Sequence, residues 1–235
     1  MLFSIVVPCY NEAENIPLIL ERFKEAIGTR EDIEVILVNN GSTDNSAEVL
    51  DGILPGYPFA RTVTVEVNQG YGYGILRGLN ASKGDFLGWT HADMQTDPAD
   101  VIKAINMISS NGCLKKLYVK GSRRGRSLSD TFFTAGMSVF ETVYLHTELK
   151  DINAQPNMFS RAFFGKWKNP PYDFSLDLYA LYMAKKCGCR IIRFPVVFPE
   201  RIHGQSKWNS GFKSKMKFIK RTLDFSRELK RKGIS

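Results

Sequence analysis

The sequence lacks the features expected of a membrane-spanning or exported protein. Within its 235 residues, no apolar run approaches the roughly 18 residues that cross a bilayer. Any membrane contact is therefore expected to be peripheral. Residues 1–8 have no basic stretch before their apolar part and no small-residue cleavage site, so they predict a strand and not a signal peptide.

Cysteine is also scarce, and its spacing excludes the usual zinc sites. Cys187 and Cys189 are one residue apart, which is the wrong spacing for a zinc knuckle, and the chain has no second cysteine pair. Cys9 lies in an apolar stretch and is expected to pack as a small hydrophobic residue. Together with Cys113, these residues predict four reduced thiols in a cytoplasmic protein.

Internal repeats, low-complexity segments and Ser/Gly-rich linkers are absent as well. One domain, residues 1–208, followed by a basic amphipathic helix, residues 209–235, is the simplest organisation. Basic residues outnumber acidic ones by 32 to 24, and nine of them lie in residues 212–232, against two acidic residues there. This excess favours anionic partners, namely nucleic acid, anionic lipid or phosphorylated substrates.

Apolar, β-branched stretches alternate with helical periodicity through the first half of the chain. Strands are predicted at 3–7, 33–38, 61–67 and 85–89, and helices at 14–27, 46–54, 75–81 and 99–109. A looser pattern adds strands at 117–121, 157–160 and 190–199 and helices at 132–145 and 177–186. The alternation is typical of an α/β fold with a mostly parallel central sheet flanked by helices.

Polar side chains follow the fourth predicted strand, in the segment from His91 through Asp93 and Gln95 to Asp97. Ligands bind at the carboxyl ends of the strands in an open α/β sheet. Oxygen ligands at that edge suit Mg²⁺ or Mn²⁺, which can be shared with substrate phosphates. The segment therefore predicts a metal–nucleotide site.

Two other predicted strands also end in polar residues. Tyr10 could stack on a base or ribose, while Glu12, Asn39 and Asn40 offer hydrogen bonds to ribose and base edges. Each segment alone is equally an ordinary strand-exit turn, where Asn and Gly are common. Their repetition at successive strand ends favours one shared binding edge.

In chain order, these motifs resemble glycosyltransferase family 2, and within it the polyprenyl-phosphate subgroup typified by dolichyl-phosphate mannose synthase. The motifs are residues 6–12, 38–44 and 92–95, with further matches at 121–123, 151–156 and 201–208. The resemblance spans about residues 3–208. It implies the GT-A (Rossmann-like) fold, a divalent metal, and transfer of a sugar from a nucleoside diphosphate with inversion at the anomeric carbon.

The resemblance also implies residue roles. It makes Asp93 and Gln95 the metal ligands. The chain departs from the family where Asn39–Asn40 replaces the usual Asp–Asp, which changes the base contacts on offer. It departs again where His91 begins the Asp-x-Asp motif. His91 then either donates to the diphosphate or fills space.

Glycines and basic residues supply further candidates. Gly70, Gly72 and Gly74 predict a turn in which the backbone approaches the nucleotide, with Arg77 as a phosphate contact. Arg123, after a Gly-Ser turn, is a phosphate candidate of the same kind. In the resembling family, the loop at 201–208 closes over the donor diphosphate, where cations stabilise the leaving group. The residues predicted to contact the nucleotide sugar are Pro8, Tyr10, Asn11, Glu12, Asn39, Asn40, Gly70, Arg77, His91, Ala92, Arg201, Ser206 and Lys207.

Acceptor chemistry depends on Asp173 and Asp177 at the start of a predicted helix. In relatives that act on hydroxyl acceptors, an acid in this region is the general base. A phosphate acceptor is already anionic and needs no strong base. If the enzyme uses a base, Asp177 is the first candidate. Asp93, Arg123 and Asp177 make up the predicted catalytic set. The alternative role of Asp177 is to compensate the charge at the helix N-terminus.

The basic tail has two interpretations. Apolar residues at helical spacing alternate with Lys and Arg over 208–232, which suits either an anionic membrane surface or a helix docked on the core.

The predicted function is an inverting, metal-dependent glycosyltransferase. Its partners are a nucleoside-diphosphate sugar and either a lipid phosphate or a saccharide hydroxyl of a cell-surface polysaccharide. A nucleotidyltransferase would need a Gly/Arg-rich signature after the first strand, which residues 8–12 lack. A nucleic-acid-binding module would leave the acidic and amide cluster without a role, so no nucleic-acid partner is expected. The pattern indicates no oligomeric state.

Overall fold

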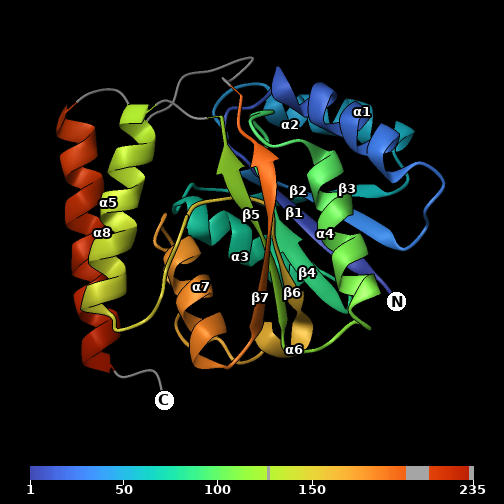
Figure 1. Cartoon of the computed structure of the whole chain (residues 1–235). Helices are drawn as coiled ribbons and strands as arrows, with labels where there is room; N and C mark the ends of the chain where they lie inside the picture. The colour runs from blue at the N-terminus through green and yellow to red at the C-terminus, as the bar shows by residue number, and fades with distance from the viewer. Residues whose placement is uncertain (126–127, 200–211, 233–235) are drawn as a thin grey trace.

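A seven-stranded sheet forms the centre of the computed structural model, which describes residues 1–125, 128–199 and 212–232 (Figure 1). The strands are β1 (Phe3–Cys9), β2 (Ile33–Asn40), β3 (Ala60–Val65), β4 (Phe86–Trp89), β5 (Leu117–Arg124), β6 (Asn157–Ser160) and β7 (Arg190–Val197). Their order is β3-β2-β1-β4-β6-β5-β7, and only β6 runs antiparallel to its neighbours within this sheet of described residues. The loop before β6 therefore lies at the edge where the other strands end.

Helices cover both faces of the sheet. They are α1 (Asn15–Ile27), α2 (Ser46–Ile53), α3 (Tyr71–Ala81), α4 (Pro98–Ser110), α5 (Leu128–Tyr144), α6 (Arg161–Phe164), α7 (Leu176–Lys186) and α8 (Phe212–Lys232), with a 3₁₀ turn at Leu54–Gly56. One buried cluster joins α1 and α4 to the sheet, and a second joins α3 and α7 to its other face. These findings confirm the predicted α/β architecture.

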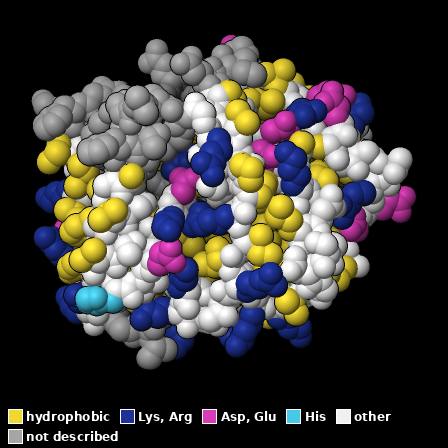
Figure 2. All heavy atoms as spheres, in the orientation of Figure 1, with side chains coloured by type: hydrophobic (Ala, Val, Ile, Leu, Met, Phe, Trp, Pro, Cys, Tyr) yellow, Lys and Arg dark blue, Asp and Glu magenta, His cyan; other side chains and the backbone are white. Residues whose placement is uncertain are grey.

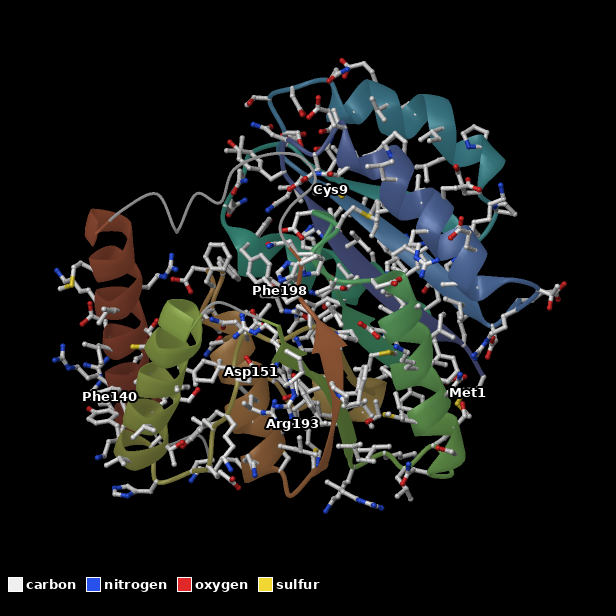
Figure 3. All side chains as sticks on the ribbon, turned by 45° about the horizontal axis from the view of Figure 1, so that its top comes forward. Met1, Cys9, Phe140, Asp151, Arg193 and Phe198 are labelled. Carbon is white, nitrogen blue, oxygen red and sulfur yellow. The ribbon has the colours of Figure 1, made fainter. Side chains whose placement is uncertain are left out.

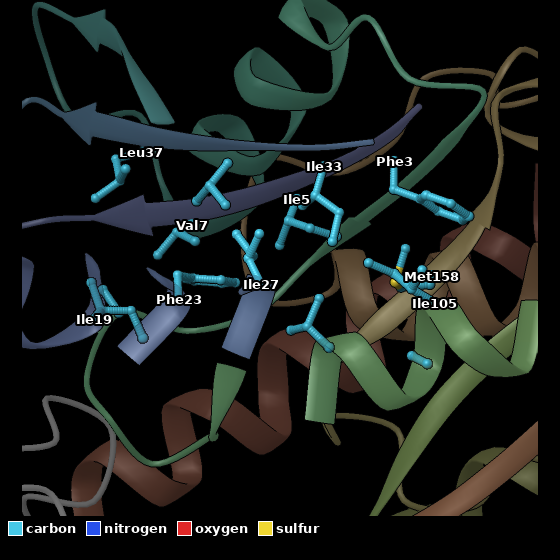
Figure 4. Close-up of a cluster of buried hydrophobic side chains, with 14 of the residues drawn as sticks. Phe3, Ile5, Val7, Ile19, Phe23, Ile27, Ile33, Leu37, Ile105 and Met158 are labelled. Carbon is cyan, nitrogen blue, oxygen red and sulfur yellow. The ribbon is translucent and has the colours of Figure 1, made fainter. Parts of the chain in front are cut away.

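The first strand shows why these segments form a doubly covered sheet. Successive side chains of a strand point to opposite faces. Ile5 and Val7 accordingly lie in the α1–α4 cluster (Figure 4), while Val6 lies in the α3–α7 cluster. A parallel strand covered on both faces reads as a continuous apolar run, and each such buried side chain contributes about 1.5–3 kcal/mol. The buried apolar side chains of α1, including Phe23, lie in the same cluster as Ile5 and Val7.

Helix α3 begins earlier than the glycine pattern indicates. The predicted turn over residues 68–74 ends at Gly70, and the helix starts at Tyr71 instead of near residue 75. Gly72 lies so close to another loop that a Cβ atom there would be 2.6 Å from the carbonyl oxygens of Pro171 and Asp173. The glycines therefore let α3 pack against residues 171–173, which the local sequence does not show.

The C-terminal helix α8 is docked on the rest of the chain. It runs beside α5 in Figure 1, and Ser226 and Leu229 are buried. The Ser226 hydroxyl donates to Glu141 Oε2 at 2.5 Å, which ties α8 to α5. The predicted domain boundary at residue 208 lies outside the described residues. Among the helices that the structure describes, none combines the length and apolar character needed to cross a membrane.

Candidate functional site

The predicted motifs meet at one edge of the sheet. Strands β2, β1 and β4 are neighbours and run parallel, so the residues that follow them lie together. The loop before the antiparallel β6 and the segment after β7 reach the same edge. Figure 3 shows Phe198, just after β7, between Cys9 at the end of β1 and Asp151 in the loop before β6. The fold therefore places the β1, β2 and β4 motifs at one site.

The loops after β1 and β2 are bound to each other through Asn11. Its backbone is left-handed, with φ of 57°. The Asn11 side-chain oxygen accepts from Thr43 N at 2.8 Å, and the Asn11 backbone N–H donates to Ser42 Oγ at 3.1 Å. Glu12 is held similarly, since its backbone N–H donates to Ser46 Oγ at 3.0 Å. These residues fix the two loops that were predicted to contact the nucleotide.

The Asn39–Asn40 pair is buried, at 6% and 3% exposed. The Asn39 side-chain oxygen accepts from Ser42 N at 3.2 Å, and Asn40 Nδ2 donates to the Gly70 carbonyl oxygen at 3.0 Å. An aspartate at position 40 could not donate to that carbonyl. The amide is therefore matched to its neighbour at the start of α3.

Asp93 and Gln95 occupy a tight turn after β4. Asp93 is 5% exposed, and its Oδ1 accepts from the Gln95 backbone N–H at 3.2 Å. Met94 between them has a left-handed φ of 58°. Gln95 Nε2 donates to the Pro199 carbonyl oxygen at 3.1 Å, so Oε1 is the atom that this amide would offer a cation. Among the described residues, no three His, Cys, Asp or Glu side chains group as a metal site.

His91 lies beside an aromatic pair. The rings of Tyr71 and Phe174 stack with centroids 4.6 Å apart, and the His91 ring lies 5.9 Å from Tyr71 on a tilt. Burial raises the pKa of Asp177, against the lowering effects of Lys120 and His91. The histidine therefore lies between the turn predicted to hold the metal and the predicted acceptor side.

A buried polar network lies beneath this aromatic pair. Asp177 is 2% exposed, and its Oδ1 accepts from Gln155 Nε2 at 2.9 Å and Asn157 Nδ2 at 3.2 Å. Lys120 is fully buried and donates to Asn157 Oδ1 at 2.6 Å. Burial lowers the pKa of Lys120 to about 7. Lys120 and Asp177 are thus linked through the side-chain amide of Asn157.

Arg123 is paired with Asp151 in the loop before β6. Its backbone N–H and its Nε donate to the two carboxylate oxygens, each at 2.7 Å. The Arg123 side chain is 7% exposed, and the Phe198 ring lies 5.6 Å from its guanidinium carbon. The arginine joins β5 to the loop before β6. A phosphate bound to Arg123, as predicted, would have to share its guanidinium with the Asp151 carboxylate.

The other predicted residues are dispersed. Arg77 is exposed on α3 and lines a separate hollow with Trp167 and Tyr172, apart from the strand-end motifs. Ala92 is buried in the α1–α4 cluster, and Pro8 lies within β1 beside Val38 of β2. Tyr10 and Gly70 lie at the edge, where β1 and the β3–α3 loop end.

Predicted residues Arg201, Ser206 and Lys207 lie outside the described residues.

Sequence reasoning missed Lys120, Tyr71 and Phe174. A lysine inside the apolar strand Leu117–Arg124 is a signal that a charge is buried there, because lysine is almost never buried without partners. No comparable signal marks Tyr71 and Phe174, because their contact joins residues about a hundred positions apart.

Comparison with known proteins gives a consistent result. The model of the family described as Glycosyl transferase family 2 matches residues 4–176. An undecaprenyl-phosphate 4-deoxy-4-formamido-L-arabinose transferase of Yersinia enterocolitica is 36% identical over 107 residues, which are 44% of this chain and 32% of that protein. The corresponding transferase of Edwardsiella ictaluri is 26% identical over 208 residues, which are 87% of this chain and 62% of that protein. The matches thus span less than two thirds of these relatives.

Solved structures share the fold. Glucosyl-3-phosphoglycerate synthase of Mycobacterium tuberculosis, in complex with Mn²⁺, UDP and glucosyl-3-phosphoglycerate, superposes with a TM-score of 0.71 at 20% identity, covering 96% of this chain and 79% of that one. A mannosyltransferase of Pyrobaculum calidifontis, in complex with GDP-mannose and Mn²⁺, gives 0.65 at 20% identity, covering 88% and 59%. At this identity the likeness establishes the fold, which is GT-A-like as predicted.

Proposed function

This chain belongs to glycosyl transferase family 2, and on that premise we propose that it moves a sugar from a nucleoside-diphosphate sugar to a polyprenyl phosphate with inversion at the anomeric carbon. The observation that carries the proposal is the turn at Asp93–Gln95, which directs a buried carboxylate and an amide to the edge shared by the β1 and β2 motifs. The two relatives described above have names that contain undecaprenyl phosphate, which supports a polyprenyl phosphate as the acceptor.

Asp93 and Gln95 fit a Mg²⁺ or Mn²⁺ ion as an incomplete ligand set. Magnesium commonly takes one or two carboxylates from a protein and completes its octahedron with waters and substrate phosphates. One carboxylate beside one amide oxygen matches that pattern. When bound, the cation would neutralise charge on the donor diphosphate. The Mn²⁺ in both structural neighbours supports this assignment.

The residues of the two N-terminal loops would bind the nucleoside. Tyr10 would stack on the base or ribose, and Glu12 and Asn39 would bond the ribose and base edge. The bonds between the two loops hold this surface in place before the donor arrives. Pre-ordering of this kind lowers the entropic cost of binding.

The surroundings of Asp177 favour a phosphate acceptor over a saccharide hydroxyl. A general base must come within hydrogen-bond reach of the acceptor proton. Asp177 is 2% exposed, and its Oδ1 accepts from two side-chain amides. A phosphate oxygen is already anionic, so it can attack the anomeric carbon without such a base. Arg123, if it shares its guanidinium with Asp151, would help to stabilise the departing diphosphate.

The outer surface of α5 and α8 would face an anionic membrane. Val139, Phe140, Val143 and Met216 are 64%, 39%, 67% and 47% exposed, and Figure 2 shows hydrophobic side chains gathered over these helices with Lys and Arg beside them. Each cation near such a surface contributes on the order of 1 kcal/mol. This contact would bring the enzyme to a lipid acceptor at the cytoplasmic face.

Donor binding is tested by a thermal-shift panel of UDP-, GDP-, CDP- and dTDP-sugars with and without Mn²⁺. We expect one nucleotide class to raise the melting temperature, and to do so more strongly with Mn²⁺. A panel in which no nucleotide changes the melting temperature would contradict the proposal. Turnover with a saccharide but not with undecaprenyl phosphate would replace the proposed acceptor with the hydroxyl alternative.

A further inference from the structure

Lys120 is a charged side chain with no exposed surface, placed on β5 beneath the site. Its Nζ donates to the Ala154 carbonyl oxygen and to Asn157 Oδ1, each at 2.6 Å. The Tyr118 hydroxyl donates to the same Asn157 oxygen at 2.9 Å. A buried ammonium is tolerated only when it is hydrogen-bonded in this way. Lys120 is therefore held in place by specific hydrogen bonds, although the proposed reaction does not use it.

These donors fix the orientation of two amides in succession. Because Asn157 Oδ1 accepts from Lys120, its Nδ2 must face the opposite way, where it donates to Gln155 Oε1 at 2.7 Å. Because Gln155 Oε1 accepts, its Nε2 must in turn donate. It does so to Asp177 Oδ1 at 2.9 Å and to the Tyr71 hydroxyl at 3.2 Å. In its charged form Lys120 has donors only, so below its pKa the starting point of this chain cannot be reversed.

The chain of amides ends at the site. Tyr71 stacks on Phe174 and lies beside His91, two residues before Asp93. Asp177 Oδ1 receives both amide donors. Thus Lys120 is linked by consecutive hydrogen bonds to groups on the proposed acceptor side.

We propose that Lys120 is a positioning residue, which sets the orientation of Asn157 and Gln155 and so holds Asp177 and Tyr71 in their working arrangement. The inference rests on the proposed function, because sugar transfer is the reaction that this arrangement would serve.

The charges around Lys120 make its effect measurable as a function of pH. The titratable groups that face it are Asp177 on α7, Asp151 before β6, Arg193 on β7 and Arg123 on β5. Burial raises the pKa of Asp177, while the charge on Lys120 opposes that rise. Removing the charge should therefore raise the pKa of Asp177 further. Because the ionised Asp177 carboxylate accepts both amide donors, its protonation should disturb the arrangement, and the acidic limb of the rate–pH profile should move to higher pH.

The test compares Lys120→Met and Asn157→Asp with wild type and with Lys103→Met, an exposed lysine on α4 as the matched control. An aspartate at 157 still accepts from Lys120 but cannot donate to Asp177. Both test variants should lower kcat by about 10- to 100-fold, since small displacements near the chemistry have effects of that size. Donor affinity should stay within about twofold, and K120M should also shift the acidic limb upward.

The double variant K120M/N157D separates positioning from packing. Residues acting through one pathway lose activity non-additively, so the double variant should be no slower than the slower single variant. Multiplied losses would overturn the inference, as would lower melting temperatures with unchanged kcat and pH profile. Should K120M not fold, N157D alone decides by the same kcat criterion.

A readout without turnover separates this inference from the proposed function. The ¹⁵N side-chain amide signals of Asn157 and Gln155 should be dispersed in wild type and should lose that dispersion in K120M. Signals unchanged in K120M would overturn the inference whatever the activity. Wild-type protein that moves no sugar would instead overturn the proposed function, while the amide signals would still report on Lys120.

Discussion

Asn40 donates its side-chain amide to the Gly70 carbonyl oxygen at 3.0 Å, and so ties the end of β2 to the start of α3. Both partners belong to motifs at the proposed donor edge. The bond explains why an amide suits position 40, where the family usually has an acid.

Replacing Asn40 with Asp should therefore destabilise the protein. The variant puts a carboxylate against a carbonyl oxygen at a side chain that is 3% exposed. Loss of a buried bond of this kind costs about 1–3 kcal/mol, measurable by urea unfolding. Asn39→Asp is the matched control, since that side chain accepts from Ser42 N and an acid keeps the bond. Equal losses in the two variants would contradict the assignment of the Asn40 bond.

Replacing Asp93 with Ala should remove the metal response. A metal supplies several kcal/mol of transition-state stabilisation, so transfer should fall by at least about 100-fold. The further rise in melting temperature that Mn²⁺ gives a bound nucleotide sugar should disappear.

Asp97→Ala controls for charge loss in the same segment. Asp97 caps α4 through Ala99 N at 2.8 Å and pairs with Arg22. Its removal should cost about 1 kcal/mol of stability, as cap losses do, and leave the Mn²⁺ response intact. If the two variants lost the Mn²⁺ response equally, Asp93 would not be the ligand.

Glu141 should make the α5–α8 contact sensitive to pH. Burial raises the pKa of its carboxyl to about 7, against the lowering effect of the Ser226 hydroxyl. A raised pKa means that the folded protein favours the protonated, neutral carboxyl. The stabilisation from this proton is fully present below the unfolded pKa near 4.5 and is lost as the pH rises through the folded pKa of about 7.

Glu141→Gln, which is neutral at every pH, should therefore have a higher melting temperature than wild type at pH 8. The difference should be about 2–4 °C, which roughly 1 kcal/mol gives in a protein of this size. At pH 4, below both pKa values, the two proteins should melt together. A difference that is the same at both pH values would show that Glu141 does not titrate in this range.

The α5–α8 surface should bind anionic vesicles through its apolar residues. Val143 is 67% exposed, so Val143→Glu should leave the fold intact while placing a negative charge against the lipid. Binding to phosphatidylglycerol vesicles in a sedimentation assay should fall by about tenfold, since a lost apolar contact and a repelled charge together amount to about 1–2 kcal/mol. Val67→Glu, at a residue 69% exposed in the loop between β3 and α3, is the control. Equal binding by the two variants would place the membrane contact elsewhere.

The fold could be predicted where the pattern is local. The alternation of buried strands and amphipathic helices gives β1 to β4 with their helices, because a strand covered on both faces must be apolar throughout. The antiparallel direction of β6 could not be predicted. That strand has four residues, and its direction is set by pairing with β4 and β5, which are distant in the chain.

The same division holds for the site. Asp93 and Asn39 could be proposed as site residues from the sequence, because one follows β4 and the other lies at the end of β2, and the carboxyl ends of these strands must meet. Lys120 has its role through Asn157 and Asp177, at separations of 37 and 57 residues, so no local pattern connects them. The start of α3 could not be predicted for a similar reason, because Gly72 makes room for the loop at Pro171, which is distant in the chain.

The proposed activity is measured directly as transfer of the sugar to the lipid acceptor. Purified protein would be incubated with undecaprenyl phosphate, Mn²⁺ and the nucleotide sugar that raises its melting temperature most, and the lipid fraction analysed by mass spectrometry. We expect a polyprenyl-phosphate glycoside that forms with wild type and is lost with Asp93→Ala. Release of the nucleoside diphosphate with the lipid left unmodified would contradict it.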